Sequence, residues 1–129
     1  MVVIMQLHGV RVLVAEDEPV QAFDIRDLLT ALGAEVIGPA RTVEKALELA
    51  TNDDFDCAVL DVKLKDGDID PVARLIERQG KGIVFLTAYG ANHLHEECPS
   101  APIVSKPYLE PHLTKAVITV CRRSAGKAA

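Results

Sequence analysis

Short apolar runs alternate along the chain with stretches in which apolar residues recur every three or four positions. Five of the runs predict strands, at residues 10–15, 35–37, 57–60, 83–86 and 103–104. Most of these runs are apolar throughout, which is typical of strands that are buried on both faces of a sheet.

The stretches between these runs predict amphipathic helices. Their apolar stripes are Ile25, Leu28, Leu29 and Leu32; Val43, Ala46, Leu47 and Ala50; and Leu109, Leu113, Ala116, Val117 and Val120. The pair Asp70-Pro71 predicts a further helix, with Asp70 as its N-cap and the proline in its first turn. Gly33 and Gly80 are expected to end helices in a left-handed conformation. Residues 88–98 carry a weaker pattern, which predicts a short helix at most.

Strands that alternate with helices predict an α/β fold, in which a doubly wound, five-stranded parallel sheet has helices on both faces. In such a sheet the functional crevice lies beyond the carboxyl ends of the strands. The residues that follow each predicted strand are therefore the candidates for chemistry.

The length of 129 residues fits one compact domain, which we expect at residues 9–123 between an extension at 1–8 and a tail at 124–129. A net charge of −5 makes nucleic acid an unexpected partner, because the chain repels phosphate backbones. The apolar opening is too short to cross a bilayer, so no membrane association is expected. Three widely spaced cysteines, Cys57, Cys98 and Cys121, predict reduced thiols and a cytoplasmic protein.

Charged and hydroxyl side chains follow four of the predicted strands. They are Glu16 and Asp17, Asp61, Thr87, and Lys106 with Pro107. Carboxylates packed together repel one another unless they share a cation, and Mg2+ prefers such hard oxygen ligands. Asp61 directly follows an apolar strand and is the best candidate for a nucleophile toward phosphorus.

This arrangement resembles the receiver domain of response regulators from two-component systems. The resemblance implies a flavodoxin-like strand order of 2-1-3-4-5, Asp61 as the phosphoacceptor, and Mg2+ held by Glu16 or Asp17, by Asp61 and by the main-chain carbonyl of Lys63. It also implies that Thr87 and Lys106 bind phosphoryl oxygens, that the peptide before Pro107 is cis, and that a histidine kinase or a phosphotransfer protein is the donor.

Two positions depart from the common receiver pattern. Ile103 stands where most receivers carry an aromatic switch residue, three places before Lys106. The run from Phe85 to Gly90 resembles the motif of the "FAT GUY" receivers, which are often single-domain proteins. That resemblance implies a kinase of the HWE or a related class, a regulatory role for Tyr89, and a function as phosphorelay switch, shuttle or sink with a downstream protein partner that the sequence leaves unknown.

Three other functions compete with the receiver interpretation. A phosphatase of the haloacid dehalogenase type needs a second aspartate two places after the first, where this chain has Lys63. A zinc site at His93, His95 and Cys98 is disfavoured, because residues two apart on a helix do not face each other. A pseudo-receiver that binds proteins without being phosphorylated remains the alternative.

Overall fold

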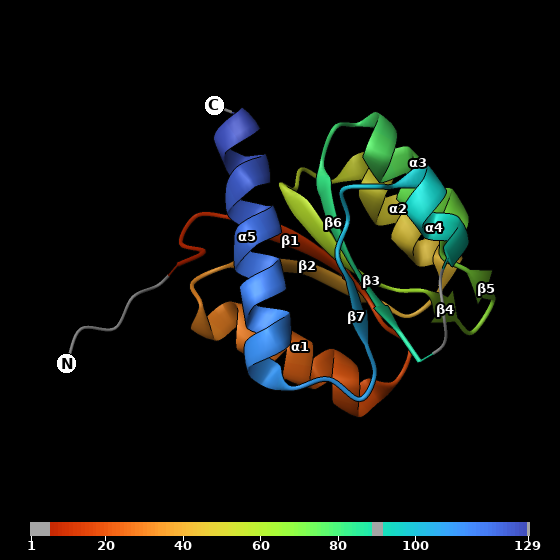
Figure 1. The fold of residues 1–129 in the computed structure, drawn as a ribbon, viewed down its shortest axis with the longest axis horizontal. Coiled ribbons are helices and arrows are strands. Elements are labelled where there is room, and N and C mark those ends of the chain that lie inside the picture. Colours follow the sequence, from red (N-terminus) through yellow and green to blue (C-terminus); the bar gives the residue numbers. More distant parts are fainter. Residues whose placement is uncertain (1–5, 89–91, 129) are drawn as a thin grey trace.

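The computed structural model describes residues 6–88 and 92–128. It contains a five-stranded parallel sheet, whose arrangement with the helices can be followed in Figure 1. The strands are β1 (Arg11–Ala15), β2 (Glu35–Ala40), β3 (Cys57–Asp61), β6 (Gly82–Thr87) and β7 (Ile103–Ser105). Their order across the sheet is β2-β1-β3-β6-β7, and every neighbouring pair is parallel. The five predicted strands and the predicted 2-1-3-4-5 order are confirmed.

Helices cover both faces of this sheet (Figure 1). On one face lie α1 (Pro19–Ala31) and α5 (Glu110–Ala128), and on the other lie α2 (Val43–Asn52), α3 (Asp70–Arg78) and α4 (Asn92–Glu97). None of the helices in the described part of the chain is long and apolar enough to cross a membrane.

The central strand β3 shows why its sequence is apolar without alternation. Cys57 and Val59 belong to the core between the sheet and α1 and α5, whereas Ala58 and Leu60 belong to the core on the opposite face. All five residues of β3 are buried. Both faces of the strand therefore need apolar side chains, and only its last residue, Asp61, is charged.

The helix ends agree in part with the sequence. Gly33 and Gly80 follow α1 and α3 with φ values of 93° and 75°, as expected for glycines that end helices. The expected N-cap at Asp70 is wrong by one position, because α3 already begins at Asp70 and Ile69 precedes it as the cap residue. The cap of α1 is Glu18, whose side chain accepts a hydrogen bond from the Gln21 amide.

Three short elements were weak or absent in the sequence pattern. α4 is only six residues long, but Leu94 and Cys98 fix the segment by burying their side chains in the core. β4 (Lys63–Leu64) and β5 (Gly67–Asp68) form a two-residue antiparallel hairpin directly after β3. Elements this short carry no periodicity, so the sequence gives no sign of them.

The last helix differs from its prediction at both ends. α5 begins at Glu110, and the side chain of Leu109 is 65% exposed instead of buried in the helical stripe. At the other end α5 continues to Ala128, and the buried Ser124 accepts a hydrogen bond from the Gly82 amide at 2.8 Å. The packed domain therefore extends past the expected boundary at residue 123.

The expected N-terminal extension also reaches the core. The side chain of Leu7 is fully buried beside residues of α1 and α5, and its amide donates to the Leu32 carbonyl at 2.8 Å. The packed body thus includes Leu7, two residues before the expected start of the domain.

The expectation of three reduced thiols is wrong for two of the cysteines. Cys57 and Cys121 form a disulfide across 64 positions of sequence, with their Cα atoms 5.2 Å apart. The spacing conceals this pair because the fold places the start of β3 against α5. Cys98 is a buried free thiol on the other face of the sheet, and burial, followed by the charge of Glu77, raises its pKa to about 11.

The burial of Leu7 can be measured through its contribution to stability. Replacing Leu7 with Ala should lower the free energy of unfolding by about 2–4 kcal/mol, because a fully buried leucine leaves a cavity. The exposed Leu109→Ala is the matched control and should change it by less than about 0.5 kcal/mol. Urea unfolding measures the free energy of unfolding of both variants. A loss for Leu7→Ala as small as that for Leu109→Ala would show that residue 7 lies outside the packed body.

Candidate functional site

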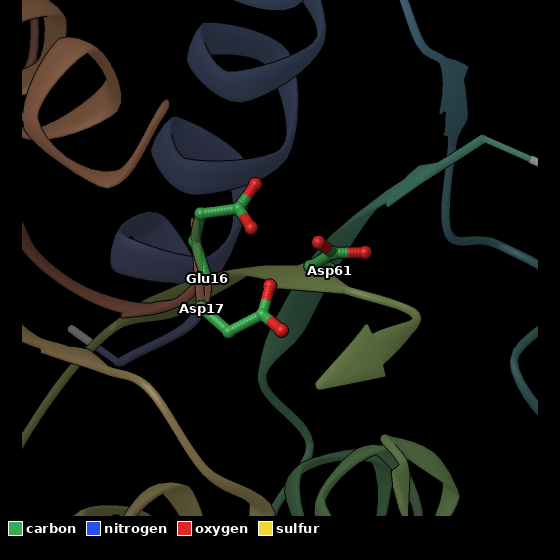
Figure 2. Close-up of side chains that lie close together, drawn as sticks. All are labelled: Glu16, Asp17 and Asp61. Carbon is green, nitrogen blue, oxygen red and sulfur yellow. The ribbon is translucent and has the colours of Figure 1, made fainter. Parts of the chain in front are cut away.

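Three carboxylates meet at the carboxyl edge of the sheet. Ala15 at the end of β1 pairs with Leu60 of β3, so Glu16 and Asp61 follow neighbouring positions. One carboxylate oxygen from each of Glu16, Asp17 and Asp61 lies within 4.8 Å of the other two. Figure 2 shows these three side chains close together at the strand ends. The convergence that was expected from the strand ends is therefore present for the acidic groups.

Lys106 supplies the positive charge at this edge. Its Nζ atom donates hydrogen bonds to Glu16 Oε1 at 2.7 Å and to Asp61 Oδ2 at 2.8 Å. Lys106 follows β7, and the peptide between it and Pro107 is cis, as the resemblance implied. Only 15% of the Lys106 side chain is exposed, so the ammonium group lies within the site.

Burial changes the acid–base properties of the two residues that share this contact. The Glu16 side chain is fully buried, and desolvation, with further contributions from Asp61, raises the pKa of Glu16 to about 7. Burial alone would lower the pKa of Lys106, but its hydrogen bonds to Asp61 and Glu16 outweigh that effect and raise it. Near neutral pH the lysine is charged, while the raised pKa of Glu16 means that this residue holds its proton more strongly than an exposed carboxylate does.

Thr87 and Lys106 lie at adjacent strand ends. Thr87 is the last residue of β6, its side chain is nearly buried, and its carbonyl accepts a hydrogen bond from the Lys106 amide at 2.7 Å. Asp61 pairs with Leu86, the residue before Thr87. The strand register therefore places the threonine one residue beyond the level of Asp61.

Lys63 begins the hairpin that leaves the site. Its amide donates to Asp61 Oδ1 at 3.3 Å, while its side chain is exposed. The neighbouring Leu64 is buried in the core and anchors the hairpin. The structure thus places the main chain of Lys63, which the resemblance assigned to the metal, beside the Asp61 carboxylate.

Two positioning residues were missed by the sequence analysis. Asp66, at the tip of the hairpin, accepts hydrogen bonds from the amides of Val43 and Glu44 at 2.7 and 3.2 Å. The bond from Val43 is the main cause of a lowered pKa of Asp66. Glu18 caps α1 just after the acidic pair. The contacts of Asp66 with α2 join residues 22 or 23 positions apart and have no local signal in the sequence. Glu18 did have a local signal, because it is an acidic residue directly after Asp17 and just before Pro19.

The expected regulatory residues lie at a different edge. Ile103 is half-buried in the edge strand β7, pairs with Phe85, and lines an open hollow of about 460 Å³ together with Pro107 and Leu109. Tyr89 lies outside the described residues. The only group of three or more potential metal ligands found among the described residues is Glu16, Asp17 and Asp61.

Comparison with known families decides what kind of domain carries this site. Residues 12–118 match the family model of the response regulator receiver domain. The chain belongs to this family. Receiver domains are signalling domains and not a classical enzyme family.

Individual relatives agree with this assignment. This receiver is 36% identical over 84% of its length to the phyllosphere-induced regulator PhyR of Methylorubrum extorquens, and 33% identical over 83% to the transcriptional regulatory protein PdtaR of Mycobacterium tuberculosis. A receiver protein from Sinorhizobium medicae superposes with a TM-score of 0.81 at 25% identity, covering 92% of this chain and 98% of that one.

The receiver covers only part of its curated relatives. It spans 42% of the length of PhyR and 54% of the length of PdtaR. The activities and partners of those longer proteins therefore do not transfer to this chain as findings.

The raised pKa of Glu16 gives the metal-free protein a specific pH dependence. Between the ordinary pKa of 4.5 and about 7 the unfolded chain releases the Glu16 proton while the folded protein keeps it. The contribution of protonated Glu16 to the free energy of unfolding is therefore complete below pH 4.5 and is lost as the pH rises through about 7. In buffer that contains a metal chelator, the free energy of unfolding of wild type should fall relative to that of Glu16→Gln as the pH rises from 4.5 to about 7. Urea unfolding across the window measures this, with the exposed Glu96→Gln as control, and parallel curves for wild type and Glu16→Gln would contradict it.

Proposed function

We propose that this receiver accepts a phosphoryl group on Asp61 from a histidine kinase or a histidine-containing phosphotransfer protein, in a Mg2+-dependent reaction in the cytoplasm. The observation that carries the proposal is the contact of the Asp61 carboxylate with the Lys106 ammonium at 2.8 Å, within reach of two further carboxylates. This arrangement offers a nucleophile, a fixed cation and a set of metal ligands at one strand edge.

The donor set fits a hard divalent cation. Three carboxylates within 4.8 Å carry more negative charge than the single Lys106 ammonium neutralises, and the burial of Glu16 makes that excess unfavourable. Glu16, Asp17, Asp61 and the carbonyl of Lys63 are the groups that would hold Mg2+, which suits few protein carboxylates and keeps several waters. When bound, the ion would offset negative charge on the transferred group.

Asp61 performs the bond-forming step. One of its carboxylate oxygens attacks the phosphorus of a phosphohistidine, so that a P–O bond forms and the P–N bond breaks. The electron pair of the broken bond stays on the imidazole nitrogen of the donor. Asp61 is suited to this role because its backbone ends the rigid, fully buried strand β3.

Lys106 and Thr87 act on the transferred group. Once the phosphoryl oxygens are present, the Lys106 ammonium is expected to bind one of them as a fixed positive charge. The Thr87 hydroxyl, from the next strand end, is a hydrogen-bond donor for another. Since Lys106 is already bonded to Glu16, it retains a carboxylate partner when its bond to Asp61 is replaced.

The place of this chain in a signalling route follows from its donor and its relatives. We propose a donor of the HWE or a related kinase class and a role as switch, shuttle or sink that acts through a protein partner. The role through a protein partner is supported by the similarity to PhyR, which in Bartonella quintana is an anti-anti-sigma factor. Phosphotransfer assays against purified kinases of the same organism would rank the donors by rate.

Phosphoryl transfer to Asp61 can be tested directly. With Mg2+ and a small phosphodonor, wild type should gain one phosphoryl group that hydroxylamine removes, as expected of an acyl phosphate, and Asp61→Asn should gain none, because an amide is not a competent nucleophile. The exposed Asp54→Asn, at the opposite end of β3, should label like wild type. Intact mass spectrometry and phosphate-affinity gels give the readout. Undiminished labelling of Asp61→Asn would overturn the assignment, and an unlabelled wild type would favour a pseudo-receiver.

Mg2+ binding provides an independent test of the site. The double variant Glu16→Gln/Asp17→Asn should bind Mg2+ at least about tenfold more weakly, because two hard ligands are lost together. The control is Asp24→Asn/Asp27→Asn, which removes the same two charges from the exposed face of α1. Calorimetric titration compares the two, and an equal loss in both would mean that only net charge attracts the ion.

A further inference from the structure

We infer that Cys57 and Cys121 form a redox site, a reversible cross-link whose reduction by dithiols is gated by detachment of the C-terminal half of α5 from the sheet. The inference is independent of phosphoryl transfer. It rests on where the two sulfurs lie and on how tightly α5 packs around them.

Both cysteines occupy positions that hold α5 against the sheet. Cys57 is the first residue of β3, and Cys121 continues the buried stripe of α5 that includes Leu113 and Val117. The side chains of both cysteines are fully buried. An external thiol therefore has no path to either sulfur while α5 is in place.

Close to Cys121, α5 approaches strand β6 very closely. A Cβ atom built on Gly82 of β6 would lie 2.5 Å from Val120 Cγ1 and 2.4 Å from Ser124 Oγ, so only glycine allows this approach. The Gly82 amide also donates to Ser124 Oγ at 2.8 Å. These contacts flank Cys121 on either side in sequence, and they must open before the disulfide is exposed.

The chemistry is thiol–disulfide exchange. A thiolate of the dithiol attacks one sulfur, the Cys57–Cys121 bond breaks, and a mixed disulfide forms with one released thiolate. The second thiol of the reagent then displaces the other cysteine. Two electrons and two protons pass to the protein, and the dithiol becomes a cyclic disulfide. An oxidised dithiol re-forms the bond by the reverse steps.

The third cysteine does not compete in this exchange. Cys98 lies in the core on the opposite face of the sheet, and its raised pKa keeps it a neutral thiol, which is a poor nucleophile. The redox couple therefore consists of Cys57 and Cys121 alone. The ring that they close contains Asp61, Thr87 and Lys106, so the oxidised chain has far less freedom when unfolded.

The Cys57–Cys121 redox couple is tested first by counting free thiols and by comparing the melting temperatures of the oxidised and reduced forms. Protein oxidised with an excess of oxidised dithiol and then unfolded in an alkylating reagent should gain one adduct, on Cys98, and three after reduction. The oxidised form should melt about 10 °C above the reduced form. Cys98→Ala should keep that difference, and Cys121→Ala should lose it. Three adducts in the oxidised sample, or a melting difference that persists in Cys121→Ala, would overturn the inference.

The gate is tested by the rate of reduction of folded protein at a fixed dithiol concentration. Ser124→Ala removes one contact beside Cys121 and should speed reduction about fivefold. Gln79→Ala removes a comparable hydrogen bond, to the Ala50 carbonyl on the opposite face, and should leave the rate within about twofold. Val120→Ala weakens the packing of α5 against Gly82 in a second way and should also speed reduction. Equal acceleration by all three variants would show that reduction requires global unfolding, and no acceleration by Ser124→Ala and Val120→Ala would show that α5 is not the gate.

Discussion

The site depends on a charge balance at the carboxyl edge of the sheet. A single ammonium group, Lys106 Nζ, contacts Glu16 and Asp61 at 2.7 and 2.8 Å, while Asp17 adds a third carboxylate. Buried like charges are unfavourable without a counterion, and Glu16 responds with a raised pKa. We propose that this unmet negative charge gives the edge an affinity for a divalent ion, which would let an incoming phosphoryl group approach Asp61.

The remainder of the fold keeps these groups in place. The parallel sheet brings the ends of β1, β3, β6 and β7 to one edge, and both of its faces are buried, so the strand ends cannot shift independently. Beyond β3, Leu64 anchors the hairpin and Asp66 ties its tip to the first turn of α2. On the other face, the disulfide and the close contact at Gly82 hold α5 to the central strands. The covalent link lies at the end of β3 opposite to Asp61, so stability and chemistry occupy different ends of one strand.

Much of this could be predicted from sequence because it follows from local pattern. Strands that are buried on both faces appear in the sequence as unbroken apolar runs, and the charged residues that follow three of these runs mark the functional edge. This pattern indicated Glu16, Asp17, Asp61 and Lys106 together. Contacts between distant residues had no such signal. Three such contacts join segments that only the fold brings together. They are the hydrogen bond of Asp66 to the start of α2, the burial of Leu7 in the core, and the Cys57–Cys121 bond. Cys121 did carry one hint, because it falls four residues after Val117 on the buried stripe of α5.

Lys106 and a metal ion would share the carboxylates of Glu16 and Asp61, so Mg2+ affinity measures the charge balance of the site most directly. Calorimetric titration at a pH above the pKa of Glu16 would compare wild type with Lys106→Met, which keeps the aliphatic part of the side chain and removes its charge. If the lysine neutralises Glu16 and Asp61 as the 2.7 and 2.8 Å contacts indicate, the variant should bind Mg2+ several-fold more tightly than wild type. Unchanged or weaker binding would contradict the account, since it would mean that the ammonium and the ion do not share these ligands.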